Sequence, residues 1–260
     1  MMSRLRVAIG EQLKECPQVI TLGVRSQLSD YTRTERELLR TADMIFYPPD
    51  RFVDLFATLG KDTFPSLNCY RLHGDRLKQT SLLRLLNAPH PRTRVYFGHE
   101  QKQQILEDFS LPLVAKKPRD AFDSKNVFFI NDRAKFDWYN RNFNPAYIQE
   151  YVTAEQKLRV IVLNYNTVFG YRRTLPRDDF LDTSVSRGVW KVDEVDTRGI
   201  ELAKSIALGG SLSDVAVDMV FDGSIFWVLE LQFHYDQSGF HQPGFDRSRL
   251  ILEMIERGEL

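Results

Sequence analysis

The most informative stretch of this 260-residue sequence reads Asp218-Met219-Val220-Phe221-Asp222-Gly223-Ser224-Ile225-Phe226-Trp227-Val228-Leu229-Glu230-Leu231-Gln232. It predicts two apolar strands around a tight turn, because residues of high strand propensity flank an Asp-Gly turn signal. Asp218 and Glu230 interrupt these strands, and a buried carboxylate without a partner is costly. Each carboxylate therefore needs a basic side chain or a metal ion.

The length of the turn decides whether the two carboxylates share a face of the hairpin. A two-residue loop would pair Phe221 with Ser224 and would put Asp218 and Glu230 on opposite faces. A three-residue loop would bring Asp218, Glu230 and Gln232 together, so we expect the two carboxyl groups to converge and the Asp222–Ser224 connection to hold an odd residue or a bulge. Oxygen donors that converge in this way suit Mg²⁺. The alternative is that the carboxylates pair with arginines, and these residues alone favour that alternative.

Basic side chains interrupt other apolar stretches of the chain. Lys116 ends an apolar run, Arg159 and Arg173 lie in the two strands of one predicted hairpin, and Arg187 precedes Gly188 in a loop. Arginines on strands that face carboxylates indicate an anionic ligand held between cations and a metal. The alternatives are a surface lysine on an edge strand for Lys116 and ordinary salt bridges for the arginines.

Composition excludes some classes of function. Lys plus Arg and Asp plus Glu number 35 each, and this balance argues against nucleic acid as the main partner. Cys16 and Cys69 are too far apart to form a metal-spaced pair, which favours free thiols in a reducing compartment. No apolar run approaches the ~18–20 residues of a membrane helix, and the basic N-terminus lacks the apolar core of a signal peptide. We therefore expect a cytoplasmic protein without membrane contact.

Short apolar runs alternate with amphipathic stretches, the pattern of an α/β or α+β chain. Strands are predicted at 19–24, 44–47, 67–70, 113–117, 126–130, 146–152, 158–163, 167–173, 215–221 and 225–231. Helices are predicted at 34–41 (with Thr34 as its cap), 51–59, 77–86, 101–109, 135–140, 202–208 (ending at Gly209-Gly210) and 247–256.

Several segments in order resemble one known family. From about Asp75 to Phe240 the chain is similar to ATP-grasp enzymes of the RimK and glutathione-synthetase-like group. The similar segments are Gly74-Asp75-Arg76 with a leucine-rich helix and Pro91-Arg92-Thr93; Leu111-Pro112-Leu113-Val114-Ala115-Lys116; Tyr147-Ile148-Gln149-Glu150-Tyr151-Val152; Leu158-Arg159-Val160-Ile161-Val162 with Tyr171-Arg172-Arg173; Ser184-Val185-Ser186-Arg187-Gly188; and Val217-Asp218 through Leu229-Glu230-Leu231-Gln232.

The resemblance implies an ATP-grasp fold of two α+β subdomains that grip ATP, over residues 74–260. A small, reduced βα domain of the pre-ATP-grasp kind would precede it, over residues 1–73. The nucleotide would be held by Arg76, Lys78, Lys116, Arg119, Gln149, Glu150, Tyr151, Val152 and Arg159. Mg²⁺, or Mn²⁺ in its place, would be bound by Asp218, Glu230 and Gln232. Arg173 and Arg187 would stabilise the transferred phosphoryl group.

The chain departs from the family pattern at a few positions. Arg76 replaces a lysine, Gln232 and Ser184 each replace an asparagine, and Lys157 stands where the family often has an aspartate. The loop over residues 119–126 has no glycine, whereas the family's phosphate lid is rich in glycine. Backbone approach to phosphates is harder without glycine, so side chains are expected to make those contacts.

The function that the resemblance implies is an ATP- and Mg²⁺-dependent ligase. ATP would phosphorylate a carboxylate, and an amine would then displace phosphate from the acyl phosphate. Both substrates would be small molecules or peptides, whose identity the sequence leaves open. Two alternatives are a nucleotide-binding protein without catalysis and a phosphotransferase that acts on a hydroxyl group. The oligomeric state is also open, a homodimer included.

Overall fold

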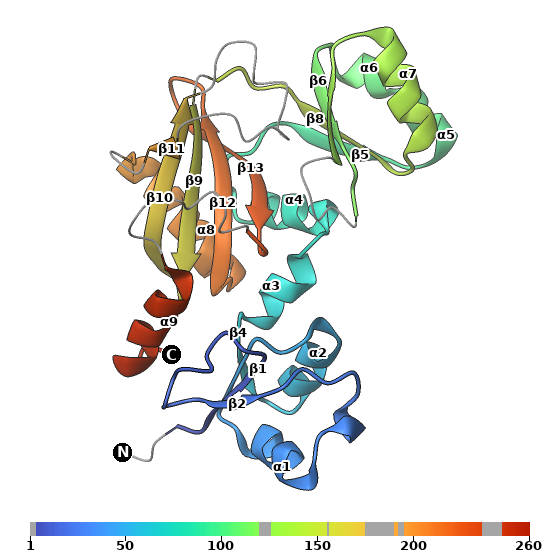
Figure 1. Cartoon of the computed structure of the whole chain (residues 1–260). Helices are drawn as coiled ribbons and strands as arrows, with labels where there is room; N and C mark the ends of the chain where they lie inside the picture. The colour runs from blue at the N-terminus through green and yellow to red at the C-terminus, as the bar shows by residue number, and fades with distance from the viewer. Residues whose placement is uncertain (1–3, 120–125, 155, 175–189, 192–194, 236–245) are drawn as a thin grey trace.

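The computed structural model describes the chain except for residues 1–3, 120–125, 155, 175–189, 192–194 and 236–245 (Figure 1). Three sheets, each with helices beside it, follow one another along the sequence. This is the mixed α and β architecture that the alternation of apolar runs predicts.

The first sheet is parallel, in the order β2-β1-β3-β4. Its strands are β1 (Arg6–Ile9), β2 (Ile20–Leu22), β3 (Met44–Phe46) and β4 (Asp62–Phe64), and the helices around it are α1 (Arg33–Thr41), α2 (Asp50–Thr58), α3 (Leu67–Leu72) and a short 3₁₀ turn (Leu28–Asp30). Both faces of the sheet are covered, because alternate residues of β1 and β3 belong to two different apolar clusters.

Two local predictions in this region are wrong, and two strands were missed. The run predicted as a strand at 67–70 is helix α3, while β1 and β4 were not predicted. A run of three or four apolar residues does not separate a strand from a helical turn, and tertiary packing decides between them. Helix α1 is capped by Thr32 rather than Thr34, since the Thr32 hydroxyl accepts from the Glu35 amide and the Glu35 carboxylate accepts from the Thr32 amide.

The second sheet is antiparallel, in the order β5-β8-β6-β7, and α4 (Arg76–Leu85) leads to it. Its elements are β5 (Thr93–Tyr96), α5 (Gly98–Gln103), α6 (Ile105–Asp108), β6 (Leu113–Lys116), β7 (Val127–Ile130), α7 (Arg133–Asn142) and β8 (Ala146–Glu150). Strand β5 was not predicted, and the single helix predicted at 101–109 is divided into α5 and α6. A separate apolar cluster, which includes Tyr96, Leu113 and Ile148, fills the space between this sheet and its helices.

The third sheet has the order β11-β10-β9-β12-β13 and carries the hairpin with which the sequence analysis began. Its elements are β9 (Gln156–Leu163), β10 (Asn166–Thr174), β11 (Trp190–Lys191), α8 (Thr197–Gly210), β12 (Asp214–Phe221), β13 (Phe226–Gln232) and α9 (Arg247–Glu256). Helix α8 covers one face, where Ala203 and Ile206 pack with Val160 and Val217.

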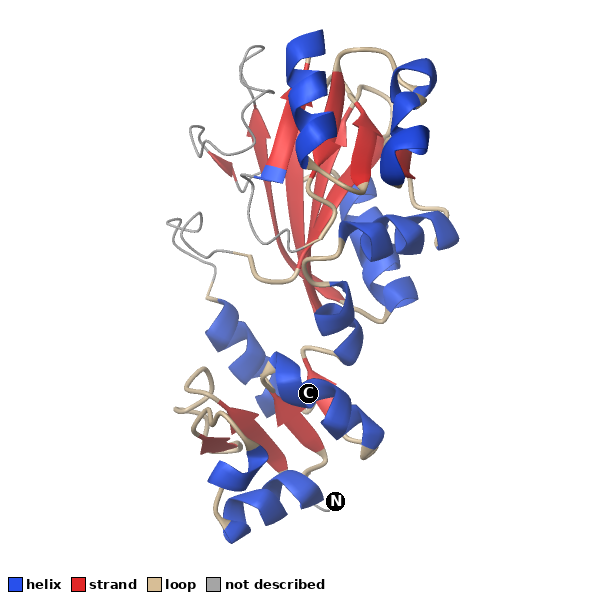
Figure 2. Ribbon diagram, turned by 90° about the vertical axis from the view of Figure 1, so that its right-hand side faces the viewer, coloured by secondary structure: helices blue, strands red, loops and turns tan. Residues whose placement is uncertain are grey.

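The other face of the third sheet joins the first sheet through the C-terminal helix. Ile161 and Ala216 of the third sheet, Phe46 of the first sheet and Ile251 of α9 belong to one apolar cluster. Figure 2 shows α9 beside the first sheet, at the same end of the molecule. The first and third sheets therefore share a core, whereas the second sheet has its own. The proposed domain division after residue 73 stays a prediction.

Helix α8 ends at Gly210, in line with the predicted end at Gly209-Gly210. Both glycines lie inside the helix, which is capped by Ser211 in the left-handed region at φ 52°. A Cβ atom at Gly209 would lie 2.6 Å from a methyl group of Leu86, so this glycine permits the close approach of α8 to the end of α4.

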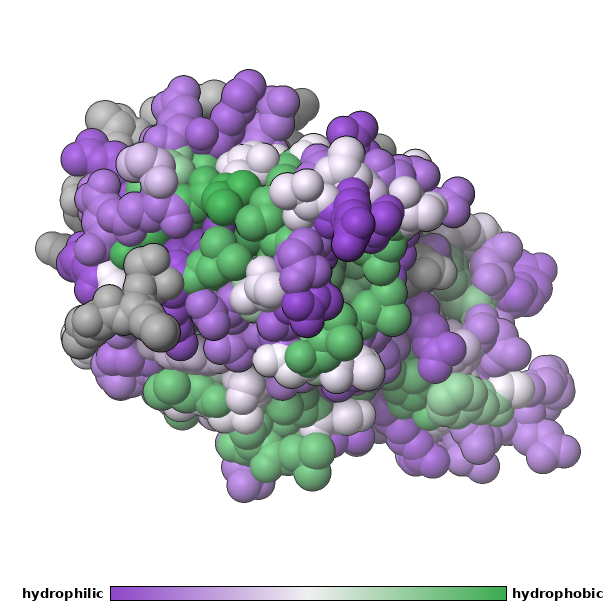
Figure 3. All heavy atoms as spheres, turned by 90° about the horizontal axis from the view of Figure 1, so that it is seen from below, coloured by the Kyte–Doolittle hydropathy of each residue, from purple (hydrophilic) through white to green (hydrophobic). Residues whose placement is uncertain are grey.

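The surface is mixed in character. Seen from the end that carries the first sheet, apolar groups lie scattered among hydrophilic ones (Figure 3). Leu55 of α2 and Leu59, which directly follows this helix, are examples of exposed apolar side chains, 48% and 61% exposed. Scattered apolar groups are ordinary on protein surfaces and identify no partner by themselves. Among the helices that the structure describes, none has the length and apolar character needed to cross a membrane.

Candidate functional site

The β12–β13 hairpin brings Asp218 and Glu230 to the same face of the third sheet. Four residues connect the strands, because Phe221 pairs with Phe226, so the predicted three-residue loop is wrong. A bulge in β13 at Leu229 supplies the odd residue instead, and Asp218 lies directly opposite Glu230. Cross-strand partners project to the same side of a sheet. The two carboxylates therefore converge as predicted, and a bulge is the cause, but it lies in β13 and not in the turn.

Asp218 is neutralised by an arginine on its other neighbouring strand. Arg159 of β9 is the direct cross-strand partner of Asp218, and its Nε and Nη2 donate to the two carboxylate oxygens at 2.5 and 2.7 Å. Burial lowers the pKa of the Arg159 guanidinium, but the Asp218 carboxylate more than offsets this, so the net shift is upward. Arg159, Asp218 and Glu230 thus form a row across three strands.

Glu230 is neutralised by an arginine from α4. The Arg76 guanidinium donates from Nε and Nη2 to Glu230 Oε1 at 3.1 and 2.7 Å, and from Nη1 to the Lys117 carbonyl at 2.9 Å. Only 3% of the Arg76 side chain is exposed. The alternative in which arginines neutralise both carboxylates is therefore what the structure shows. The other oxygen of Glu230, Oε2, could still bind a metal, since both Arg76 contacts are to Oε1.

Lys116 reaches the same place from the second sheet. Its Nζ donates to the carbonyl of Leu229, the bulged residue of β13, at 3.0 Å. Strand β6 lies inside the second sheet and Lys116 is buried, so the alternative of a surface lysine on an edge strand is wrong. Burial lowers the pKa of the Lys116 amine to about 8, although the Glu230 carboxylate opposes the shift. Cations from α4, β6 and β9 therefore surround two carboxylates.

The donors present fit a hard divalent cation. Asp218, Glu230 and Gln232 are oxygen donors, and Gln232 alternates with Glu230 along β13, so it shares the same face. Carboxylate and carbonyl oxygens are the ligands that Mg²⁺ takes, with phosphate oxygens completing its shell. Among the described residues, no group of three or more His, Cys, Asp or Glu side chains forms a metal cluster. A metal here would therefore depend on the Gln232 amide and on ligand oxygens.

The predicted adenine contacts lie at the end of β8. Gln149 is buried and its amide donates to the Thr93 hydroxyl at 3.1 Å, so the side chain holds β8 against β5. The Glu150 amide donates to the Arg92 carbonyl at 2.8 Å. Tyr151 packs against Phe129 of β7 with ring centroids 5.1 Å apart, and Val152 follows it. A nucleotide role for these residues stays a prediction.

The remaining predicted residues are spread more widely. Lys78 and Arg119 line a separate pocket, together with Asp75. Arg173 lies in β10 with its Cα opposite that of Lys157, and Arg187 lies outside the described residues. Most of the glycine-free loop after Arg119 also lies outside them.

Two features of the site were not predicted from sequence. Asp75 caps α4, because its Oδ1 accepts from the amides of Leu77 and Lys78 at 3.1 Å, and this cap fixes the start of the helix that carries Arg76. Its sequence signal is an aspartate before a helical run. The second feature is the Leu229 carbonyl at the bulge of β13, which accepts the hydrogen bond from Lys116. No residue type in the sequence predicts a bulge at this position.

The charges of this row give a prediction about metal binding. The site has three cations (Arg76, Lys116 and Arg159) and two carboxylates (Asp218 and Glu230), so its net charge is +1. This positive charge disfavours the binding of a divalent cation when no nucleotide is present. We expect Arg76→Met to bind Mn²⁺ at least about ten-fold more tightly than the parent chain when no nucleotide is present. Electron paramagnetic resonance of free Mn²⁺ measures this affinity.

The matched control for this prediction is Arg33→Met, which removes an exposed arginine of α1 and should leave the affinity unchanged. Equal Mn²⁺ affinities in the parent chain and in a folded Arg76→Met variant would show that the guanidinium does not compete with a metal.

Comparisons with known proteins find a curated relative and several solved structures that resemble this chain. No family model matches the chain. A curated relative, the N5-carboxyaminoimidazole ribonucleotide synthase of Saccharolobus solfataricus, is 26% identical over 132 residues, which are 49% of this chain and 36% of that protein. The match thus spans little more than a third of the relative's length.

Solved structures cover much more of the chain. An ADP complex of N5-carboxyaminoimidazole ribonucleotide synthetase superposes with a TM-score of 0.67 at 16% identity, over 92% of this chain and 73% of that one. A RimK-domain ATP-grasp protein from Sphaerobacter thermophilus superposes with a TM-score of 0.63 at 17% identity, over 87% of this chain and 90% of that one. The fold implied by the sequence motifs is confirmed: this chain has the ATP-grasp fold.

Proposed function

We propose that the chain is an ATP- and Mg²⁺-dependent ligase that joins a carboxylate to an amine through an acyl phosphate. The observation that carries the proposal is that three cations from separate elements, Arg76, Lys116 and Arg159, surround the carboxylates of Asp218 and Glu230. Such an arrangement suits a ligand with several negative charges, because the cations come from both sides of the space between the second and third sheets. The named relatives support it, since one is a synthase and another holds ADP.

The chain's own residues would act mainly by positioning and charge. Lys116 and Arg76 would donate to phosphate oxygens, and Arg159 would keep Asp218 in place on β12. Arg173 and Arg187 are proposed to stabilise the group in transfer, as the family resemblance implies. Phosphoryl transfer needs little covalent chemistry from the protein, so aligned donors supply most of the catalysis.

Mg²⁺, or Mn²⁺, would be held by Asp218, Glu230 and Gln232, and it would neutralise charge on the phosphates. Contact with phosphates would draw Arg76 and Lys116 away from Glu230 and the Leu229 carbonyl, which frees oxygens for the metal. The end of β8, at Gln149, Glu150, Tyr151 and Val152, is proposed to lie against adenine. The substrates would be a carboxylate and an amine of a small molecule or peptide.

A nucleotide-binding protein without catalysis is the second candidate. The arginine contacts on both carboxylates favour it, because a site already neutralised by guanidinium groups has less need of a metal. Amine-dependent release of phosphate from ATP separates the two functions. A ligase releases phosphate only when both a carboxylate and an amine are supplied, whereas a binding protein releases none.

Nucleotide binding itself is tested by thermal stability. ATP with Mg²⁺ at a hundred times its dissociation constant stabilises the native state by about 2.7 kcal/mol, because the ligand binds only the folded chain. For a chain of this size we expect Tm to rise by roughly 5–10 °C. Differential scanning calorimetry measures the shift. The absence of both a shift and a heat of binding at millimolar ATP would exclude both candidate functions.

A further inference from the structure

The outer edge of β13 is bound by groups from other segments of the chain. Strand β13 is last in the order of its sheet, so one of its edges faces away from β12. Backbone groups on a strand edge need partners from elsewhere when they are buried. Three of them have such partners: the Val228 amide donates to the Pro89 carbonyl at 2.9 Å, the Leu229 carbonyl accepts from Lys116 Nζ at 3.0 Å, and the Leu231 amide donates to Gln79 Oε1 at 3.3 Å.

Gln79 supplies the contact from α4, and both ends of its side-chain amide are used. Its side chain is buried, its Oε1 accepts from the Leu231 amide, and its Nε2 donates to the Leu72 carbonyl at 3.0 Å. A carbonyl needs a donor and an N–H group needs an acceptor, so only one orientation of the amide satisfies both neighbours. Gln79 therefore ties β13 to the end of α3 in a defined geometry.

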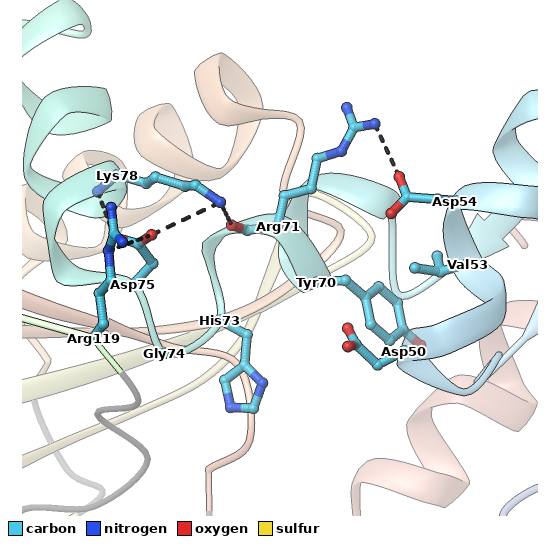
Figure 4. Close-up of a pocket in the computed structure, with 10 residues that line it drawn as sticks. All are labelled: Asp50, Val53, Asp54, Tyr70, Arg71, His73, Gly74, Asp75, Lys78 and Arg119. Carbon is cyan, nitrogen blue, oxygen red and sulfur yellow. Dashed lines mark hydrogen bonds and ion pairs between the residues drawn. The ribbon is translucent and has the colours of Figure 1, made fainter.

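The helix that carries Gln79 is fixed at its start. Asp75 caps it, and Lys78 Nζ donates to the carbonyl of Arg71 at 3.1 Å, next to the carbonyl that Gln79 contacts (Figure 4). A side chain on an anchored helix holds its partner more precisely than one on a loop does. Gln79 can therefore determine where the edge of β13 lies.

The contact with Leu231 lies at the most sensitive point of β13. Leu231 stands between Glu230 and Gln232, two of the three proposed metal ligands. Glu230 also directly follows the bulge at Leu229, where the regular pairing with β12 is interrupted. The position of Glu230 therefore depends on what holds the edge of the strand on either side of it.

The two contacts that flank Glu230 differ in what they do when a nucleotide binds. Lys116 is proposed to leave the Leu229 carbonyl and to donate to phosphate. Gln79 contacts backbone groups alone with its amide, so it can keep its hydrogen bond while the nucleotide is bound. The edge of β13 would then rely on Gln79 at the moment when Glu230 and Gln232 have to hold the metal.

We propose that Gln79 is a positioning residue for the metal ligands Glu230 and Gln232. It acts through the Leu231 amide and touches neither the nucleotide nor the metal. Outer partners that orient the ligands of a metal typically contribute 10–100-fold to its affinity. The inference rests on the proposed function and deepens it, because it names a residue on which the metal site depends and which no motif of the sequence indicates.

The test replaces Gln79 with methionine, which keeps the length of the side chain and removes the acceptor. With the β,γ-imido analogue of ATP present at saturation, we expect Gln79→Met to bind Mn²⁺ about 10–100-fold more weakly than the parent chain does. Electron paramagnetic resonance of free Mn²⁺ measures this affinity. In the chain without ligands, NMR should show hydrogen exchange at the Leu231 amide about ten-fold faster, because that amide has lost its acceptor.

Ser213→Ala is the matched control. The buried Ser213 hydroxyl accepts from the Ser66 amide at 2.8 Å, just before β12 begins, so this change also deprives a backbone amide of a side-chain acceptor. It should leave Mn²⁺ affinity unchanged. Gln79→Glu keeps an acceptor for Leu231 and should restore both the affinity and the slow exchange. If Gln79→Met does not fold, Gln79→Asn, which is one methylene too short to reach β13, takes its place with the same expected result.

Parental Mn²⁺ affinity in Gln79→Met, or an equal loss in Ser213→Ala, would overturn the proposal. A Gln79→Glu variant that binds Mn²⁺ as weakly as Gln79→Met would overturn it as well. A parent chain that binds Mn²⁺ with the analogue, but releases no phosphate from ATP with any carboxylate and amine, would remove the ligase proposal and leave the role of Gln79. A parent chain that binds no Mn²⁺ with the analogue would overturn both.

Discussion

Replacing Glu230 with glutamine is expected to lower phosphoryl transfer from ATP on the order of 1,000-fold. Glu230 lies opposite Asp218 and contacts Arg76, so it is the point where the proposed metal and the cations meet. Loss of one preorganised charged group at a centre of developing charge costs about 10²–10³ in rate, and loss of a metal ligand adds to that cost. Single-turnover phosphate release measures the effect on the chemical step.

The choice of glutamine follows from the structure. Alanine at position 230 would disturb the fold, because Arg76 is buried and pairs with Glu230. Alanine would leave the buried Arg76 guanidinium without its carboxylate partner, which would lower the free energy of unfolding by about 3–5 kcal/mol. Glutamine keeps the shape and one acceptor oxygen, so most of the stability should be retained. Glu201→Gln, on the exposed surface of α8, is the matched control. Near-parental turnover in a folded Glu230→Gln variant would rule out the proposed metal role.

The sequence predicted the hairpin well because its signals are local. Apolar residues on both sides of Asp222-Gly223 predict two strands and a turn, and both strands lie where predicted. The bulge at Leu229 has no comparable signal, since it depends on how β13 pairs with β12 and on a carbonyl that contacts Lys116. The shared face of the carboxylates was thus expected, whereas its cause required coordinates.

The contacts between distant segments were the least predictable part of the site. Arg76 lies 154 positions before Glu230, and Lys116 lies 113 positions before Leu229. Motif order indicates that such residues belong to one site, but it does not indicate which cation contacts which acceptor. The predictions of secondary structure for short segments were wrong for a related reason. The apolar run 67–70 becomes helix α3 rather than a strand because three or four residues are too few to set a period.

Lys116→Met is expected to weaken ATP binding roughly 100-fold at pH 7. A buried lysine that donates to phosphate makes a charge-assisted contact worth about 1.5–3 kcal/mol. Methionine has a similar length and fills the same apolar surroundings, so the change removes the charge with little loss of packing. Isothermal titration calorimetry measures the affinity. Lys14→Met, on an exposed part of the chain, is the control and should bind ATP normally.

The pH dependence of binding gives a sharper test of the same residue. Burial places the pKa of Lys116 at about 8, so its amine is charged below that value. Phosphates bind the charged form, and ATP affinity should therefore fall as pH rises through about 8, by up to about ten-fold per unit. Stability should respond in the opposite direction. Between about 8 and the ordinary value of 10.5, the unfolded chain binds more protons at this residue than the folded chain does, so Lys116 makes the free energy of unfolding rise with pH.

Subtracting the Lys116→Met profiles from those of the parent chain isolates both slopes from other titrating groups. Raising the pH above 8 should thus increase the free energy of unfolding and decrease the affinity for ATP, both through deprotonation of the Lys116 amine. If the fall in ATP affinity persists unchanged in Lys116→Met, the titrating group lies elsewhere and Lys116 is not the phosphate contact.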